Sequence, residues 1–117
     1  MAVFSKVKLS ESVNGRPVIV ARTATAGTDI HEAGDGSDSG AIDEIWLYAT
    51  NIDTAQIELT LEWGAAAVTD NIKITIPPKS GLTLVSPGII LTGGLTVAAF
   101  AAVGSKILLF GYVNRVT

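Results

Sequence analysis

The sequence predicts an all-β protein, a β-sandwich or jelly-roll-like pair of antiparallel sheets, and three observations support this fold class. Apolar residues recur at every second position in most segments, which is the period of a strand with one buried face. Turn-forming pairs such as Asn14-Gly15 and Gly93-Gly94 separate these segments at short intervals. No stretch carries sustained helical periodicity with capping residues. Short strands at this spacing are typical of sandwiches and barrels.

The clearest alternation runs through residues 56–63, where Ile, Leu and Trp interleave with Gln, Glu and Thr and predict one buried and one wet face. Residues 71–76 alternate in the same way and end at Pro77-Pro78, because proline cannot donate to a strand ladder. In residues 44–50 both faces are largely apolar, so this strand is expected to be central or to meet a partner. The other predicted strands are 3–9, 17–23, 82–85, 89–92, 95–101 and 106–114, with a short one around 28–31.

A chain of 117 residues corresponds to a single domain, 1–117. Residues 1–11 are interpreted as an extended N-terminal arm. Residues 24–41 are small, polar and acidic, and they predict a long loop.

The stretch from Ser80 to Ser105 contains no charged residue and is long enough on length alone to span a bilayer. Pro87-Gly88 and Gly93-Gly94 divide it into pieces of strand length, so we expect three short strands rather than a transmembrane helix. The N-terminus has two lysines and no apolar run of signal-peptide length, which argues against secretion by that route. No membrane partner is expected.

Charge is scarce and unevenly distributed along the chain. Only 16% of residues are charged and the net charge is −3, which argues against a nucleic-acid partner. Ten of the eleven acidic residues lie between 29 and 70, whereas none of the eight basic residues lies between 23 and 72. Strands from both regions could interleave and mix these charges, or the fold could present one acidic and one basic surface. We favour the first interpretation.

The side chains that catalysis or metal binding requires are few. Cysteine is absent and His31 is the only histidine, which excludes disulfides, thiolate metal sites and paired-histidine zinc sites. His31 has polar neighbours, but local proximity does not make a catalytic triad, so a polar contact near the loop is favoured. The carboxylates of Asp43-Glu44 could act with Glu58 and Glu62 in glycosidase chemistry. However, Glu58 and Glu62 fall on the predicted wet face, where solvated carboxylates normally lie.

The acidic loop around residues 35–40 is the best metal candidate, because closely spaced Asp35 and Asp38 oxygens between glycines can wrap a calcium ion. It lacks the spacing and the terminal glutamate of an EF-hand, so a loop that contacts a partner is favoured. No phosphate-binding glycine pattern is present. We therefore predict no catalytic residue, no metal site, no cofactor and no enzymatic activity.

Trp46 and Tyr48 alternate with Ile45 and Leu47, so one of these two pairs is expected to be exposed in a monomer. An exposed aromatic pair could stack on a sugar or anchor a subunit interface, where Trp and Tyr are enriched. The low charge content favours the interface.

Several segments then show a family likeness. The runs TATAGTDIHEA, DEIWLYATN, LTLEWG, DNIKITIPPKSGLTLVSPGIIL and FGYVNRVT, which cover most of the chain from about Ala24 to Thr117, resemble small structural proteins of tailed-bacteriophage virions. The resemblance implies a capsid decoration (cement) protein, with neck and tail structural proteins as an alternative within the same group.

This resemblance implies a protein that binds the major capsid protein and stabilises the head lattice. It also implies a homo-oligomer such as a trimer, located on the capsid surface of the virion and made in the cytoplasm of the bacterial host. The expected contact elements are the N-terminal segment, the acidic loop and the aromatic strand, with Phe4, Lys6, His31, Trp46 and Tyr48 as interface candidates. A carbohydrate-binding module of a particle-surface protein is the other alternative.

Overall fold

The computed structural model describes residues 2–36 and 40–117, with the backbone alone at residues 35 and 36. Nine strands and two short 3-10 helices make up the regular structure of these residues. The strands are β1 (Phe4–Lys8), β2 (Val18–Val20), β3 (Thr28–Glu32), β4 (Ile42–Asn51), β5 (Ile57–Trp63), β6 (Asn71–Ile76), β7 (Thr83–Thr92), β8 (Thr96–Ala101) and β9 (Ile107–Val116); the helices are η1 (Ala33–Gly36) and η2 (Val68–Asp70).

The strands form two antiparallel sheets, as the alternation predicts. The first sheet has the order β1-β9-β4-β7, with β2 also paired to β9, and the second has the order β3-β8-β5-β6. Strands pair in a nested series, β2 with β9, β3 with β8, β4 with β7 and β5 with β6. This nesting is one long hairpin rolled into two layers, which is the jelly-roll form of the sandwich.

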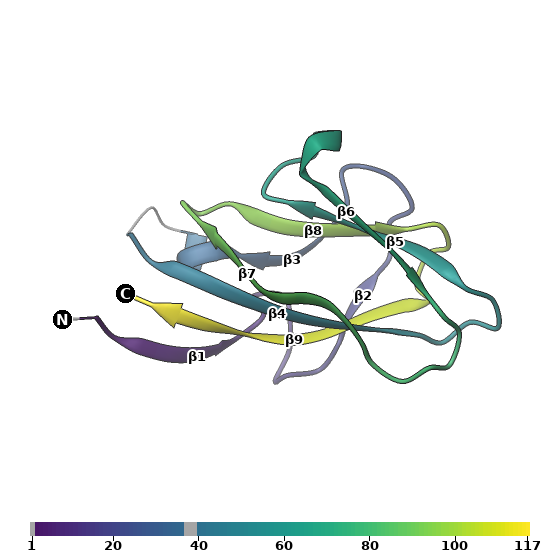
Figure 1. Cartoon of the computed structure of the whole chain (residues 1–117), viewed down its shortest axis with the longest axis horizontal. Helices are drawn as coiled ribbons and strands as arrows, with labels where there is room; N and C mark the ends of the chain where they lie inside the picture. The colour runs from purple at the N-terminus through teal and green to yellow at the C-terminus, as the bar shows by residue number, and fades with distance from the viewer. Residues whose placement is uncertain (1, 37–39) are drawn as a thin grey trace.

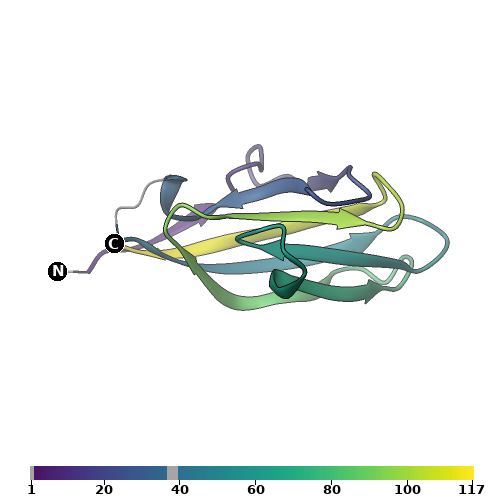
Figure 2. The same ribbon diagram turned by 90° about the horizontal axis from the view of Figure 1, so that it is seen from above.

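The molecule is elongated, with extents of 49 × 27 × 21 Å, and its strands run along the long axis (Figure 1). The two chain ends lie together at one end of the sandwich, as the perpendicular view also shows (Figure 2). Val3 and Thr117 exchange two backbone hydrogen bonds of 2.8 and 2.9 Å there. Residues 4–8, predicted both as part of a strand and as part of an extended N-terminal arm, form the edge strand β1, which pairs with β9 along its whole length.

The core lies between the sheets and is aliphatic. Inward positions of β4, β5, β8 and β9 are filled by Ile, Leu, Val and Ala side chains that are almost completely buried. In β4 the burial alternates at every residue from Asp43 to Asn51, so each side chain between them lies either in the core or on the outer surface. Trp46 and Tyr48 fall on the outer surface and Ile45 and Leu47 in the core, which resolves the alternative left open by the sequence.

One turn prediction is wrong. Pro87-Gly88 was expected to separate two strands, but β7 runs through it from Thr83 to Thr92. The pairing with β4 shifts register on either side of Trp46 and Leu47, so the proline and glycine form an irregularity in an edge strand rather than a turn. Gly88 has a φ of +77°, and its backbone lies against the Trp46 indole. The uncharged stretch therefore forms two strands, β7 and β8, and no helix among the described residues could cross a membrane.

Gly111 allows β9 and β4 to approach closely. A Cβ atom at this position would lie 2.0 Å from the backbone oxygen of Trp46, which no side-chain rotation can relieve. Gly15, by contrast, lies in open space and requires glycine only for its positive φ of 84°.

We predict that Gly111→Ala lowers the unfolding free energy by about 3 kcal/mol or more, because backbone must move within the central strand pair. Gly15→Ala is the matched control and should cost about 1 kcal/mol, the strain of the left-handed conformation alone. Chemical denaturation of both variants measures the difference. Equal costs would contradict the close approach of the two strands.

Candidate functional site

The outer surface of the first sheet carries several exposed apolar side chains. We call this surface the outer face; it consists of the outward side chains of β1, β2, β9, β4 and β7. Exposed aliphatic and aromatic side chains reach it from four of these strands: Phe4, Ile19, Ile42, Leu84 and Ile90. Half-buried aromatic side chains lie between them on the two central strands: Trp46, Tyr48, Phe110 and Tyr112.

An aromatic row crosses the middle of the outer face. The Trp46 and Tyr112 rings are stacked, with centroids 6.2 Å apart and planes inclined by 11°. The Lys6 ammonium lies 4.6 Å from the centroid of Tyr112, a cation–π geometry. Gly88 packs against the indole of Trp46 from the side of β7. Neighbours on β1 and β7 thus hold the stacked pair at both ends.

Polar groups lie at one end of this face. Glu44 accepts hydrogen bonds from Trp46 Nε1 at 2.7 Å and from Asn114 Nδ2 at 3.3 Å, and these bonds lower the pKa of its carboxyl. A shallow hollow of about 360 Å³ opens beside it, lined mainly by Phe4, Lys6, Glu44 and Asn114. The face therefore holds a carboxylate and a lysine at the border of its apolar area.

Four of the five predicted interface residues come together here. Phe4 and Lys6 reach the face from β1, and Trp46 and Tyr48 reach it from β4. His31 does not belong to this surface, because its side chain is 1% exposed and lies in the interior.

His31 belongs to a buried polar cluster at the end of the sandwich. Its Nε2 donates to Asp43 Oδ2 at 2.7 Å. Arg115 Nε and Nη2 donate to the two oxygens of Asp43 at 2.7 and 2.9 Å, and the Gly34 amide donates to the same carboxylate at 2.9 Å. All of these groups are buried. Through these bonds four elements, β3, η1, β4 and β9, meet at the carboxylate of Asp43.

The charge of Asp43 is well compensated. Burial raises the pKa of this carboxyl, but hydrogen bonds from Arg115, His31 and the Gly34 amide, together with the positive charge of Arg115, outweigh it and lower the pKa to about 2. Asp43 and Arg115 are direct partners on β4 and β9, so the ion pair is a cross-strand pair on the inner face.

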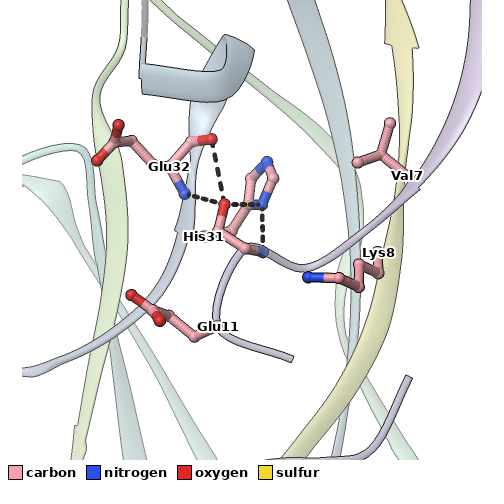
Figure 3. Close-up of a pocket in the computed structure, with 6 residues that line it drawn as sticks. Val7, Lys8, Glu11, His31 and Glu32 are labelled. Atoms are coloured by element: carbon pink, nitrogen blue, oxygen red, sulfur yellow. Dashed lines mark hydrogen bonds between the residues drawn. The ribbon is translucent and has the colours of Figure 1, made fainter. Parts of the chain in front are cut away.

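Ser10 contacts the other side of the histidine, at the wall of a pocket of about 470 Å³ (Figure 3). Its backbone amide donates to His31 Nδ1 at 3.0 Å, and its Oγ lies 2.9 Å from the same nitrogen. The Oγ also accepts from the Glu32 amide at 3.0 Å.

Serine, histidine and aspartate in this order invite comparison with a catalytic triad. The hydrogen bonds here differ from those of a triad. The Ser10 amide already donates to the Nδ1 lone pair that would have to accept the proton of the serine hydroxyl. Arg115 also neutralises the carboxylate that would stabilise a charged imidazole. The arrangement fits a tether that fastens the segment after β1 to β3.

The carboxylates considered for glycosidase chemistry are separated by the fold. Asp43 points into the core and Glu44 to the outer face, because successive strand residues point in opposite directions. On the second sheet, Glu58 is exposed and lies 3.6 Å from Lys73 Nζ.

Glu62 was predicted to be solvated and is instead 2% exposed. Gly27 N and Thr25 Oγ1 donate to its oxygens at 2.6 and 2.5 Å, because the segment between β2 and β3 folds over the second sheet. The strand pattern could not reveal this covering segment.

Charges interleave across the strands as expected. Asp43 and Glu58 come from the acidic middle of the chain, and their partners Arg115 and Lys73 come from the flanks. Among the described residues no group of three or more His, Asp and Glu could hold a metal ion. The calcium candidates, the Asp35 side chain and Asp38, lie outside the described residues.

Ser10 and Arg115 were missed as members of the buried cluster. A signal was available for Arg115, because it continues the inward register of β9 through Ile107, Leu109 and Val113. A charged residue at an inward position implies a buried partner of opposite sign. No local pattern points to Ser10, which lies 21 residues before His31.

Comparison of the chain with protein-family models, curated proteins and solved structures finds no match.

We predict that Arg115→Met lowers the unfolding free energy by about 3–5 kcal/mol, because it leaves the buried Asp43 carboxylate without its cation. The double variant Asp43→Asn with Arg115→Met should recover part of this loss, since it removes the uncompensated charge. Urea denaturation of the single and double variants measures the coupling. A double variant less stable than Arg115→Met alone would contradict the assignment.

The low pKa of Asp43 also predicts a pH dependence. The carboxyl titrates at about 2 in the folded protein against an ordinary value of 3.8, so its contribution is present above pH 4 and is lost as the pH falls towards 2. Between pH 5 and pH 2, the stability difference between the wild type and Asp43→Asn should shrink by about 2 kcal/mol. Denaturation curves across this range measure it, and a constant difference would show that Asp43 has an ordinary pKa.

Proposed function

We propose that this chain is a non-enzymatic structural protein of a tailed-phage virion, which binds the capsid surface and stabilises the head lattice. The observation that carries the proposal is the outer face, an apolar and aromatic surface presented by a rigid sandwich. Phe4 is 79% exposed and Ile90 is 57% exposed on this face. Monomeric soluble proteins rarely leave large contiguous apolar patches uncovered, and such patches mark protein interfaces.

The residue types on the face support a protein partner. Trp and Tyr are enriched at the centres of interfaces and charged residues are depleted there. Here the aromatic row of Trp46 and Tyr112 is central, while Lys6 and Glu44 lie towards one end. The resemblance of the sequence to phage structural proteins is the reason for proposing that the partner belongs to a tailed-phage virion.

The stabilising mechanism would be thermodynamic. A protein that contacts two neighbouring capsid subunits binds the closed shell and loses those contacts when the shell opens, so mass action favours the closed state. Self-association would add to this effect by linking several contacts on one shell. Self-association through the outer face of the first sheet would leave the second sheet and the loops at the ends of the sandwich free to contact the capsid shell.

Neck and tail proteins of a virion would use the same kind of surface, so they remain the alternative location. A carbohydrate ligand on Trp46 and Tyr112 is less well supported. Sugars stack on free ring faces, whereas here the two rings stack on each other, Lys6 covers Tyr112 and Gly88 packs against Trp46. A glycan array probed with the purified chain tests this alternative, and we expect no binding.

The location is tested by purifying particles from lysates of the organism that encodes the chain. We expect mass spectrometry to detect the chain in sedimented particles, and immunogold labelling to place it on heads rather than on necks or tails. Particles that lack the chain would overturn the proposal. Labelling of tails alone would shift it to the alternative location.

A surface variant tests the role of the outer face. We expect Phe4→Asp to reduce incorporation into particles at least tenfold, because it places a charge in the apolar area. Val68→Asp on η2 is the matched control, since Val68 is 82% exposed and lies off this face. Both variants should melt within a few degrees of the wild type. Equal incorporation of the two variants would contradict the role of the outer face.

A further inference from the structure

We propose that the occupant of the outer face is a second copy of this chain, related by a two-fold axis that runs along β9. This inference rests on the proposed function and names the partner of the same surface. Its basis is that complementary side chains on β1 and β4 lie in the same row, on opposite sides of β9.

β9 is the central strand of three that carry the polar end of the face. Lys6 on β1 and Glu44 on β4 are both direct partners of Asn114 on β9. Because neighbouring strands lie about 4.8 Å apart, the lysine and the glutamate lie in one row at equal distances from β9, on opposite sides. Asn114 contacts Glu44 through a hydrogen bond, and Lys6 lies over the ring of Tyr112, so all of these side chains belong to the outer face.

A two-fold rotation about an axis along β9 turns one copy over and exchanges the positions of β1 and β4. Lys6 of one copy then faces Glu44 of the other, and symmetry repeats the contact. Face-to-face sheets cross at about 30°, which inclines the axis by about 15° to β9, and the long Lys6 side chain can bridge the offset that this causes near the end of the face.

The same rotation matches the neighbouring row at the end of the face. Phe4 and Ile42 are both direct partners of Val116 on β9, so Phe4 of one copy faces Ile42 of the other, and both are exposed in the single chain. One row further along, Lys8 and Trp46 are both partners of Tyr112, but the Lys8 side chain lines the pocket beside His31, so this row adds no contact (Figure 3). Two successive rows are therefore self-complementary about one strand.

The size of the surface suits a reversible dimer. β9 and β4 have ten residues and extend about 33 Å, whereas β1 has five and extends about 17 Å, so at about 4.8 Å per strand the three cover roughly 400 Å² in projection. Protruding aromatic and lysine side chains increase the accessible area above this value. Specific interfaces bury about 600–1,000 Å² on each partner, so this contact lies at the lower end of that range.

Charge reversal tests the axis directly. Lys6→Glu or Glu44→Lys alone places like charges opposite each other twice, and we expect each to weaken dimerisation at least tenfold. The double variant restores opposite charges across the interface and should dimerise within about threefold of the wild type. Sedimentation velocity over a concentration series measures each dissociation constant, at low and high salt.

Controls separate the interface from the fold. Asp29→Lys reverses an exposed charge on β3 of the second sheet, away from the outer face, and should leave dimerisation unchanged. Glu44→Gln keeps an acceptor for Trp46 and Asn114 while removing the charge, so it should weaken dimerisation while the fold stays intact, with the melting temperature of the monomer within a few degrees of the wild type. Single variants that dimerise like the wild type, or a double variant that stays as weak as the singles, would overturn the proposed axis.

The outcome is distinguishable from that of the proposed function. A wild-type chain that is monomeric at millimolar concentration but present in particles would overturn this inference and leave the particle assignment intact. A dimer that responds to the charge-reversal variants as expected but is absent from particles would support the dimer axis and overturn the proposed function.

Discussion

The buried carboxylate of Asp43 is the interaction on which the architecture depends. An unpaired carboxylate in this position would be strongly destabilising, so the fold must bring its partners to it. Arg115 reaches it from β9, His31 from β3 and the Gly34 amide from η1. Ser10 extends the cluster through His31 to the segment that follows β1. One polar centre thereby connects both sheets and the N-terminal strand at the end of an otherwise aliphatic core.

The same cluster determines what the opposite surface presents. Asp43 and Arg115 face inward as direct partners, so their neighbours Glu44 and Asn114 face outward, also as direct partners. A slip of one residue between β4 and β9 would turn every side chain to the other face. The internal ion pair therefore keeps Trp46 and Tyr112 on the outside, where they stack, and holds Glu44 in the row that contains Lys6.

The molecule thus separates two kinds of polar chemistry. Inside, Asp43, His31 and Glu62 have their hydrogen bonds satisfied within the chain and serve to connect segments that are distant in sequence. Outside, Lys6 and Glu44 border an apolar surface and carry charges that a partner can meet. This division supports the proposal that the chain acts through contacts with other protein copies. The jelly-roll form supplies a stiff support for such a surface.

The period of two in the sequence was sufficient to predict the all-β sandwich, most of its strands and the placement of Trp46 and Tyr48 on the face opposite Ile45 and Leu47, because this period is a local property of the chain. It also indicated that the acidic middle would pair with the basic flanks. The folded chain was needed to reveal which of these two faces is buried, the partners of His31, the covering of Glu62 and the continuity of β7 through Pro87-Gly88. Each of these depends on a segment from elsewhere in the chain that lies against the residue, and such contacts leave no mark on the local pattern of residues.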